Sequence, residues 1–207
     1  MNNRLTLISI ILIVGLFGHF NHANAAPSNA LIAQYNQAAA SGDIDAVLQQ
    51  LEQLKQQEAN DPLTLVYWGS ATAISAAEQF WPWSKYETAE AGLQAIDKSL
   101  SLLDAATDHT QITLRRLGLD QRCLTQAVAA ITYTAVPKMF NRFERGYDLF
   151  ITLLDSPQFQ AVLAQYTGWI YQRAIAAAVR SGDTARAEKW QQQLTASPRA
   201  ATSTIVR

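Results

Sequence analysis

Histidine is the side chain best suited to move protons near neutral pH, and this 207-residue sequence has three, His19, His22 and His109. The first two lie just behind an apolar N-terminal run, and His109 stands alone before a predicted helix. His19 and His22 lie in the N-terminal segment that would be removed as a signal peptide, so only His109 would remain. One histidine cannot form a His-x-x-x-His zinc site. The sequence also lacks a Gly-x-Ser-x-Gly motif, a Cys-x-x-Cys pair and a phosphate-binding glycine loop. We therefore interpret His109 as a solvated turn residue.

Two carboxylate pairs, Glu87 with Glu90 and Glu144 with Asp148, could supply acid–base chemistry. Each pair has lysine or arginine nearby on the same predicted helix, which favours solvated, ion-paired helix faces. The single cysteine, Cys123, has apolar neighbours, so we expect a buried and inert thiol. The sequence thus predicts no catalytic residue, no cofactor, no metal site and a protein that is not an enzyme. A carboxylate-dependent enzyme is the least favoured alternative.

The N-terminal segment has the composition of an export signal. Arg4 precedes an apolar run over residues 5–17, a more polar stretch follows, and small residues surround Ala25. This pattern predicts a secretory signal peptide, residues 1–25, cut after Ala25, and hence a periplasmic or secreted protein. The alternative is an uncleaved membrane anchor, although 13 apolar positions are fewer than a bilayer span requires.

Charge and length restrict the partners of the exported chain. Without Arg4, the 16 basic residues become 15 against 17 acidic ones, a formal charge of −2. No long-range attraction to nucleic acid or anionic lipid is expected from this balance. Nor do we expect stable membrane insertion after cleavage. The remaining 182 residues suit one domain, and a lone cysteine excludes an internal disulfide.

Apolar residues recur with helical spacing throughout, and prolines and glycines separate the periodic segments. These patterns predict an all-α fold of about eight helices in residues 28–196, with residues 197–207 as a flexible tail. One helix is expected to end near residue 41 and the next to be capped by Asp43. The following helices are expected at 62–79, 84–103, 110–135, 137–154, 157–181 and from 183 onward.

The tripeptide Ser-Gly-Asp occurs at residues 41–43 and again at 181–183, which are 140 residues apart. That distance is about four times the roughly 34-residue period of tetratricopeptide arrays. Several residues match the small and aromatic positions of that repeat: Tyr35, Gly42 and Val47; Trp68 and Gly69; Leu117 and Gly118; Gly182 and Ala187. On these residues the chain resembles tetratricopeptide-like helical repeat proteins, including exported bacterial proteins without assigned chemistry.

The resemblance implies a solenoid of stacked antiparallel helical hairpins whose first helices line a concave, partner-binding surface. Matching Gly118 to the repeat's helix-crossing glycine places two arginines on one helix face, and matching Gly42 and Gly182 to its turn glycine adds three polar residues. The implied partner-binding residues are Asn36, Arg115, Arg122, Gln172 and Arg180. Such a groove could hold an acidic peptide or its terminal carboxylate.

The alternative for these arginines is structural. Arg115, Arg116 and Arg122 would pair with carboxylates across the hairpin stack, namely Glu87, Glu90 or Asp97.

Four aromatic residues, Phe80, Trp81, Trp83 and Tyr86, surround the predicted break between two helices. They could form an apolar anchor for a partner protein or a membrane interface. Alternatively, they form a hinge and their rings fill the gap where helices 62–79 and 84–103 diverge. An exposed aromatic cluster promotes aggregation, so we expect the rings to fill this gap.

These observations predict an exported helical-repeat scaffold that mediates protein–protein interaction or assembly. Its partner would be an unidentified protein or peptide, or a second copy of the chain. The alternative is a carrier of a small hydrophobic ligand, held in a pocket between helices and enclosed by the aromatic residues at 80–86.

Overall fold

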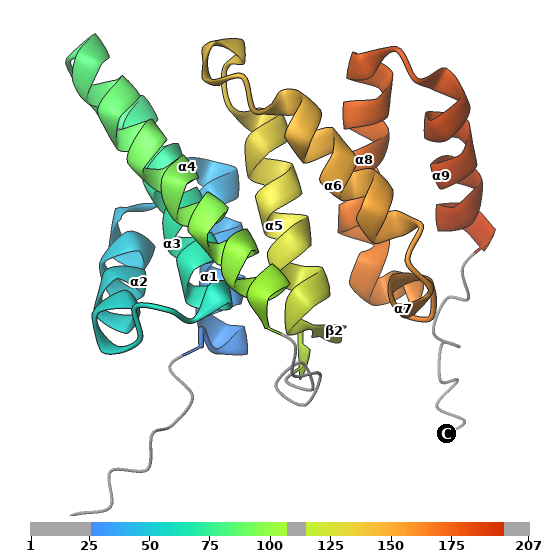
Figure 1. The fold of residues 1–207 in the computed structure, drawn as a ribbon, viewed down its shortest axis with the longest axis horizontal. Coiled ribbons are helices and arrows are strands. Elements are labelled where there is room, and N and C mark those ends of the chain that lie inside the picture. Colours follow the sequence, from blue (N-terminus) through green and yellow to red (C-terminus); the bar gives the residue numbers. More distant parts are fainter. Residues whose placement is uncertain (1–25, 107–114, 197–207) are drawn as a thin grey trace, which may run out of the picture.

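The computed structural model describes residues 26–106 and 115–196, and in these ranges the fold is all-α, as predicted (Figure 1). Its elements are α1 (Asn29–Ser41), α2 (Asp45–Gln57), α3 (Pro62–Ser75), η1 (Ala76–Glu78), α4 (Pro82–Ala105), β1 (Arg115–Arg116), β2 (Leu119–Asp120), α5 (Gln121–Ala135), η3 (Lys138–Phe140), α6 (Phe143–Leu154), α7 (Pro157–Gln160), α8 (Ala164–Ser181) and α9 (Thr184–Ala196). The predicted signal peptide, His109 and the tail at 197–207 lie outside the described residues. None of the described helices is both long enough and apolar enough to cross a membrane.

Side-chain caps explain where five of the described helices begin. The Asp61 carboxylate accepts a hydrogen bond of 2.7 Å from the Thr64 amide at the start of α3. Four other caps act in the same way, at Ser28, Asp120, Ser156 and Asp183. Proline occupies the first position of α3, α4 and α7, where its missing amide costs no hydrogen bond. The cap predicted at Asp43 is wrong, because α2 starts after Ile44 without a side-chain cap.

The two Ser-Gly-Asp tripeptides end α1 and α8 in the same way. Gly42 and Gly182 are left-handed, with φ of 86° and 83°, and the amide of each bonds back to the preceding helix. A residue with a Cβ is strained in this conformation, so glycine is required at both turns. The sequence repeat therefore marks a repeated helix end.

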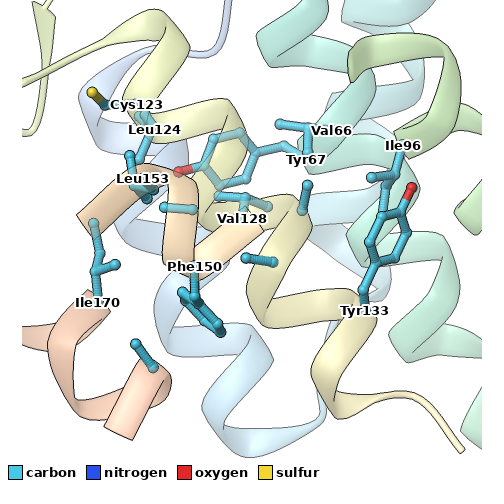
Figure 2. Close-up of a cluster of buried hydrophobic side chains, with 14 of the residues drawn as sticks. Val66, Tyr67, Ile96, Cys123, Leu124, Val128, Tyr133, Phe150, Leu153 and Ile170 are labelled. Carbon is cyan, nitrogen blue, oxygen red and sulfur yellow. The ribbon is translucent and has the colours of Figure 1, made fainter. Parts of the chain in front are cut away.

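Successive helices pack in pairs. α3 lies along α4, α5 along α6 and α8 along α9, while α3 also contacts α1, α2 and α5 (Figure 1). The first helices of the pairs thus touch one another across pair boundaries. Figure 2 shows Tyr67 of α3 among Leu124 and Val128 of α5 and Leu153 of α6, in one continuous core.

The prediction of one helix over 110–135 is wrong for residues 115–120. Arg115–Arg116 and Leu119–Asp120 pair as a two-stranded hairpin, and α5 begins only at Gln121. The connecting residues Leu117 and Gly118 both have positive φ, 52° and 80°. Two left-handed residues in succession form a tight hairpin turn and end any helix. Apolar spacing alone did not reveal this turn.

Two further predicted helices are interrupted. The segment 157–181 breaks between α7 and α8, and the segment 137–154 begins with η3 before a left-handed Asn141 leads into α6. The described residues thus contain nine α-helices, counting the four-residue α7, against about eight expected.

The α3–α4 pair is the tightest helix contact. A Cβ built on Gly92 would lie 2.4 Å from the carbonyl oxygen of Gly69 and 2.8 Å from the amide nitrogen of Ala73. A Cβ on Gly69 would lie 2.5 Å from the carbonyl oxygen of Gly92. These contacts are with backbone, which cannot move aside as a side chain can. Glycine at both positions is therefore required for the two backbones to touch.

We expect Gly92→Ala to lower the free energy of unfolding by about 1–3 kcal/mol, because the added methyl forces α3 and α4 apart. Gly168→Ala is the matched control, since a Cβ there would meet only the Leu194 side chain at 3.6 Å. In that helix interior, alanine should add up to about 1 kcal/mol. Urea denaturation of both variants measures the difference, and equal effects would contradict the close contact.

Candidate functional site

A cavity of about 760 Å³ lies on the side of the molecule formed by the first helices of the pairs. α1, α3, α5 and α8 supply its walls, together with Val136 and Pro137 after α5. Most of the lining is apolar, and the alanines at 39, 40, 73, 77 and 135 keep the side chains short. Small residues thus leave open a space that larger side chains would have filled.

Three hydroxyl groups cross the floor of this cavity in one hydrogen-bonded chain. The Tyr35 hydroxyl lies 2.6 Å from Ser70 Oγ, which lies 2.6 Å from Thr132 Oγ1. Thr132 in turn donates to the carbonyl oxygen of Val128 at 2.8 Å. The chain joins α1, α3 and α5, so each buried hydroxyl has a partner. Burial raises the pKa of Tyr35 to about 12, which the hydrogen bond to Ser70 only partly offsets.

Polar groups without such partners lie on the walls contributed by α1 and α8. The side-chain amides of Asn36 and Gln172 and the guanidinium of Arg173 line the cavity, and all three residues are exposed. Arg173 is the only charged residue in the lining. Among the described residues, its guanidinium makes no hydrogen bond or ion pair. The cavity therefore has a floor whose hydroxyl groups are all hydrogen-bonded and a wall that carries one unpaired positive charge.

The predicted partner-binding residues do not all gather here. Asn36 and Gln172 line the cavity, whereas Arg115, Arg122 and Arg180 do not. Whether any of them binds a partner stays a prediction. The prediction that Arg115 and Arg122 share a helix face is wrong, because Arg115 is in β1 and Arg122 is in the first turn of α5. The alignment on Gly118 failed because this glycine forms the hairpin turn.

Arg122 and Arg180 contact other parts of the fold, whereas the Arg115 side chain has no hydrogen bond or ion pair among the described residues. Arg122 donates to the Leu103 carbonyl at 2.6 Å, at the end of α4, and Arg180 lies 4.0 Å from the ring centre of Phe143. Arg116 donates to the Pro27 carbonyl at 3.1 Å. The alternative pairing of these arginines with Glu87, Glu90 or Asp97 is not found among the described contacts.

Glu90 and Asp97 pair instead with arginines of α6. Arg142 lies 3.3 Å from the Glu90 carboxylate and 3.1 Å from that of Asp97, and Arg145 also pairs with Asp97. The Tyr133 hydroxyl donates to Asp97 at 2.5 Å, and burial, followed by Asp97 itself, raises the pKa of Tyr133. This cluster ties α4, α5 and α6 together, so its carboxylates are occupied by structural contacts.

Sequence reasoning missed Arg173, although it follows Gln172 directly in α8. A register taken from matched glycines selected Arg180, which is about two turns further along the same helix. The signal that could have found Arg173 was the set of small residues that leaves space in front of it, but that space exists only after folding.

Phe80, Trp81, Trp83, Tyr86 and Met139 form a second feature, which we name the aromatic end. Their exposed fractions are 82%, 53%, 60%, 44% and 69%, so the prediction that the aromatic rings fill a gap between helices is wrong. α3 and α4 touch at Gly69 and Gly92, so no ring lies between them at that point. The rings lie instead at the turn that joins the two helices and at the start of α4, at the top left of Figure 1.

The exposed rings are ordered by contact with each other. Trp81 and Trp83 stack with centroids 4.8 Å apart, and Phe80 meets Trp81 edge-on at 4.9 Å. Tyr86 of α4 stacks on Phe140 of η3 at 5.2 Å, which joins the start of α4 to the segment after α5. The aromatic end is therefore one surface built from the turn before α4, the start of α4 and η3.

Reactive groups are scarce elsewhere. Cys123 is buried as predicted, and burial together with the nearby Asp120 raises its thiol pKa to about 12. A raised pKa disfavours the nucleophilic thiolate. Within the described ranges, no three His, Cys, Asp or Glu side chains are placed to hold a metal ion.

The buried hydroxyl chain predicts a specific alkaline response. The unfolded Tyr35 phenol ionises near pH 10 and the folded one near 12, so its stabilising contribution is complete below pH 10 and is lost as the pH rises to about 12. That contribution amounts to about 2–3 kcal/mol.

We expect Tyr35→Phe to cost about 1 kcal/mol at pH 7, where it removes the hydrogen bond to Ser70, but to lose less stability than the wild type between pH 10 and 12. Urea midpoints across this range measure both effects. The matched control is Tyr86→Phe at an exposed side chain. A Tyr35→Phe variant that loses stability as steeply as the wild type between pH 10 and 12 would contradict the assignment.

Comparison with known proteins adds no relative: no protein-family model matches the chain, and no curated protein or solved structure matches it. The cavity and the aromatic end are the two features of this chain that bear on its function.

Proposed function

We propose that this protein is an exported, tetratricopeptide-like scaffold that binds another protein non-covalently through its aromatic end. The observation that carries the proposal is the concentration of exposed apolar side chains. Five of the eight exposed large hydrophobic side chains among the described residues belong to the aromatic end. Soluble proteins seldom expose apolar groups in one contiguous patch unless it is an interaction site.

The scaffold assignment is supported by the way the helices pair. Four pairs follow one another, and the first helix of each pair contributes to the cavity wall. Glycine-ended turns close the first helix of the first and last pairs. The β1–β2 hairpin and α7 are additions to a plain repeat. Each helix pair buries only part of its surface alone, so stacking on its neighbours stabilises the array.

The chemistry of the aromatic end suits a protein partner. Tryptophan and tyrosine are the side chains most enriched where interfaces concentrate their binding energy. Stacking of Trp81 on Trp83 and of Tyr86 on Phe140 restrains the rings before a partner arrives. Restraint lowers the entropy that binding would otherwise cost. Lys85 is also held, because its ammonium donates to the Ala77 carbonyl at 2.7 Å.

Export remains part of the proposal. It rests on the apolar run at residues 5–17 and the small residues around Ala25. We place the scaffold in the periplasm or outside the cell.

A carrier of a small hydrophobic ligand is the second candidate, and the cavity is what favours it. Its volume of about 760 Å³ falls within the range of about 300–1,000 Å³ typical of small-molecule sites. The aromatic residues at 80–86 do not line it, so they do not enclose the pocket in the way expected for this alternative. Native mass spectrometry of the protein as purified should show a retained ligand, and a spectrum of the bare chain alone would count against a tight carrier.

The scaffold proposal predicts site-specific crosslinking in the cell. A photoreactive benzoylphenylalanine at Trp83 should give one discrete adduct with a second protein, because it keeps an aromatic ring at the aromatic end. Val179 of α8 is the matched control: it is 62% exposed and lies outside the aromatic end. Adding Trp81→Ser to the Trp83 variant should lower the adduct yield by about 10-fold or more, the usual effect of truncating a central aromatic side chain.

Gel analysis of the adducts separates the outcomes. A band with the mass of two copies identifies self-association in place of a different partner. Trp83 and Val179 variants that both remain uncrosslinked, or both give the same unselective smear, would contradict the proposal.

A further inference from the structure

The cavity divides into parts with different hydrogen-bonding needs. On its floor, the hydroxyls of Tyr35, Ser70 and Thr132 bond to one another and to the Val128 carbonyl. Ile74 and Ile131, with the short alanine side chains, make up the apolar surface around them. A ligand can therefore lie on this floor through apolar contact alone, because none of these hydroxyls is left without a partner.

The remaining polar capacity belongs to three residues on the walls. The guanidinium of Arg173 and the amides of Asn36 and Gln172 make no hydrogen bond within the described parts of the chain. Arg142 and Arg186, by contrast, pair with carboxylates, and Arg122 bonds to a helix end. A guanidinium is a suitable receptor for a carboxylate, which it can hold through two parallel hydrogen bonds.

Charge limits the head group that fits. Of the described residues in the lining, Arg173 is the only ionisable one apart from Tyr35, whose phenol burial keeps protonated at neutral pH. One positive charge balances one carboxylate, whereas a phosphate monoester carries close to two negative charges. The unbalanced second charge would have no cation in the cavity wall, so a singly charged head is favoured.

Hydrogen bonding limits the body of the ligand. An extended peptide carries one donor and one acceptor on each residue, and all of them need partners when they are buried. Among the described lining residues, the floor has no unpaired hydroxyl for them, and the walls offer only the polar side chains of the three residues named above. An alkyl chain makes no such demand. The short apolar floor thus favours a hydrocarbon body over a peptide backbone.

We propose that the cavity binds an amphiphilic monocarboxylate, with its carboxylate on Arg173 and its alkyl chain on the floor between α3 and α5. This site goes beyond the scaffold function and does not depend on the aromatic end. It gives the carrier alternative a ligand class.

The test is calorimetric titration of the full mature chain with dodecanoate below its micellar concentration. Dodecanol is the matched probe for the head group, and an apolar tetrapeptide with a free C-terminus is the matched probe for the body. We expect dodecanoate to bind with one-to-one stoichiometry. Dodecanol and the tetrapeptide should each bind about 10-fold more weakly or worse, since each lacks one of the two complementary parts.

Variants then assign the binding to the cavity. Arg173→Gln should weaken dodecanoate binding by about 10-fold or more, the loss expected for a charge-assisted hydrogen bond. Arg180→Gln on the same helix is the control and should bind as the wild type does, because Arg180 lies outside the cavity against Phe143. Ala40→Trp, at an exposed alanine of the wall, should block the space and remove binding. Circular dichroism confirms that each variant is folded.

Several results would overturn the proposal. They are no dodecanoate binding by the wild type, unchanged affinity in Arg173→Gln, equal affinity for dodecanol, or tighter binding of the tetrapeptide. The Trp81→Ser variant separates the two functions. It should bind dodecanoate normally while, in the chain that carries benzoylphenylalanine at Trp83, it loses the crosslinked partner, so failure of the cavity site and failure of the scaffold give different results.

Discussion

Gly69 of α3 and Gly92 of α4 bring two helix backbones into direct contact, and the other features follow from that contact. With no side chain between them, the two helices stay together along their length. The opposite side of α3 is then available to α1 and α5, where Ser70 joins Tyr35 to Thr132. The aromatic residues at and after the turn between the two helices lie outside the core.

The two candidate surfaces arise from opposite uses of side-chain size. In the cavity, short alanine side chains on the first helices leave a volume that the core does not fill. At the aromatic end, large rings stand where the chain reverses and no neighbouring helix covers them. One surface is concave and carries a single unpaired charge, and the other protrudes and is apolar. Binding at one surface therefore needs no contact with the other.

The distribution of arginines shows what sequence reasoning can and cannot reach. Helix periodicity placed Gln172 and Arg180 correctly on one long helix, but it could not show that Arg173 borders open space while Arg180 covers Phe143. For Arg115 even the helix was wrong, because Leu117 and Gly118 adopt left-handed conformations that apolar spacing does not reveal. The aromatic residues at 80–86 were recognised as unusual, yet their exposure depends on how closely α3 and α4 approach.

By itself the sequence determined the all-α class, the helix starts at residues 62 and 157, the helix cap at Asp183 and the two glycine-ended turns, because caps, prolines and left-handed glycines act within a few residues of chain. It also determined that Cys123 lies inside the fold, since its neighbours are apolar at helical spacing. Only the tertiary structure decided which side chains line the cavity, whether Arg173 has a partner and which aromatic rings are exposed to solvent. Those properties are set by contacts between helices far apart in the chain, and their geometry depends on backbone separation and side-chain volume.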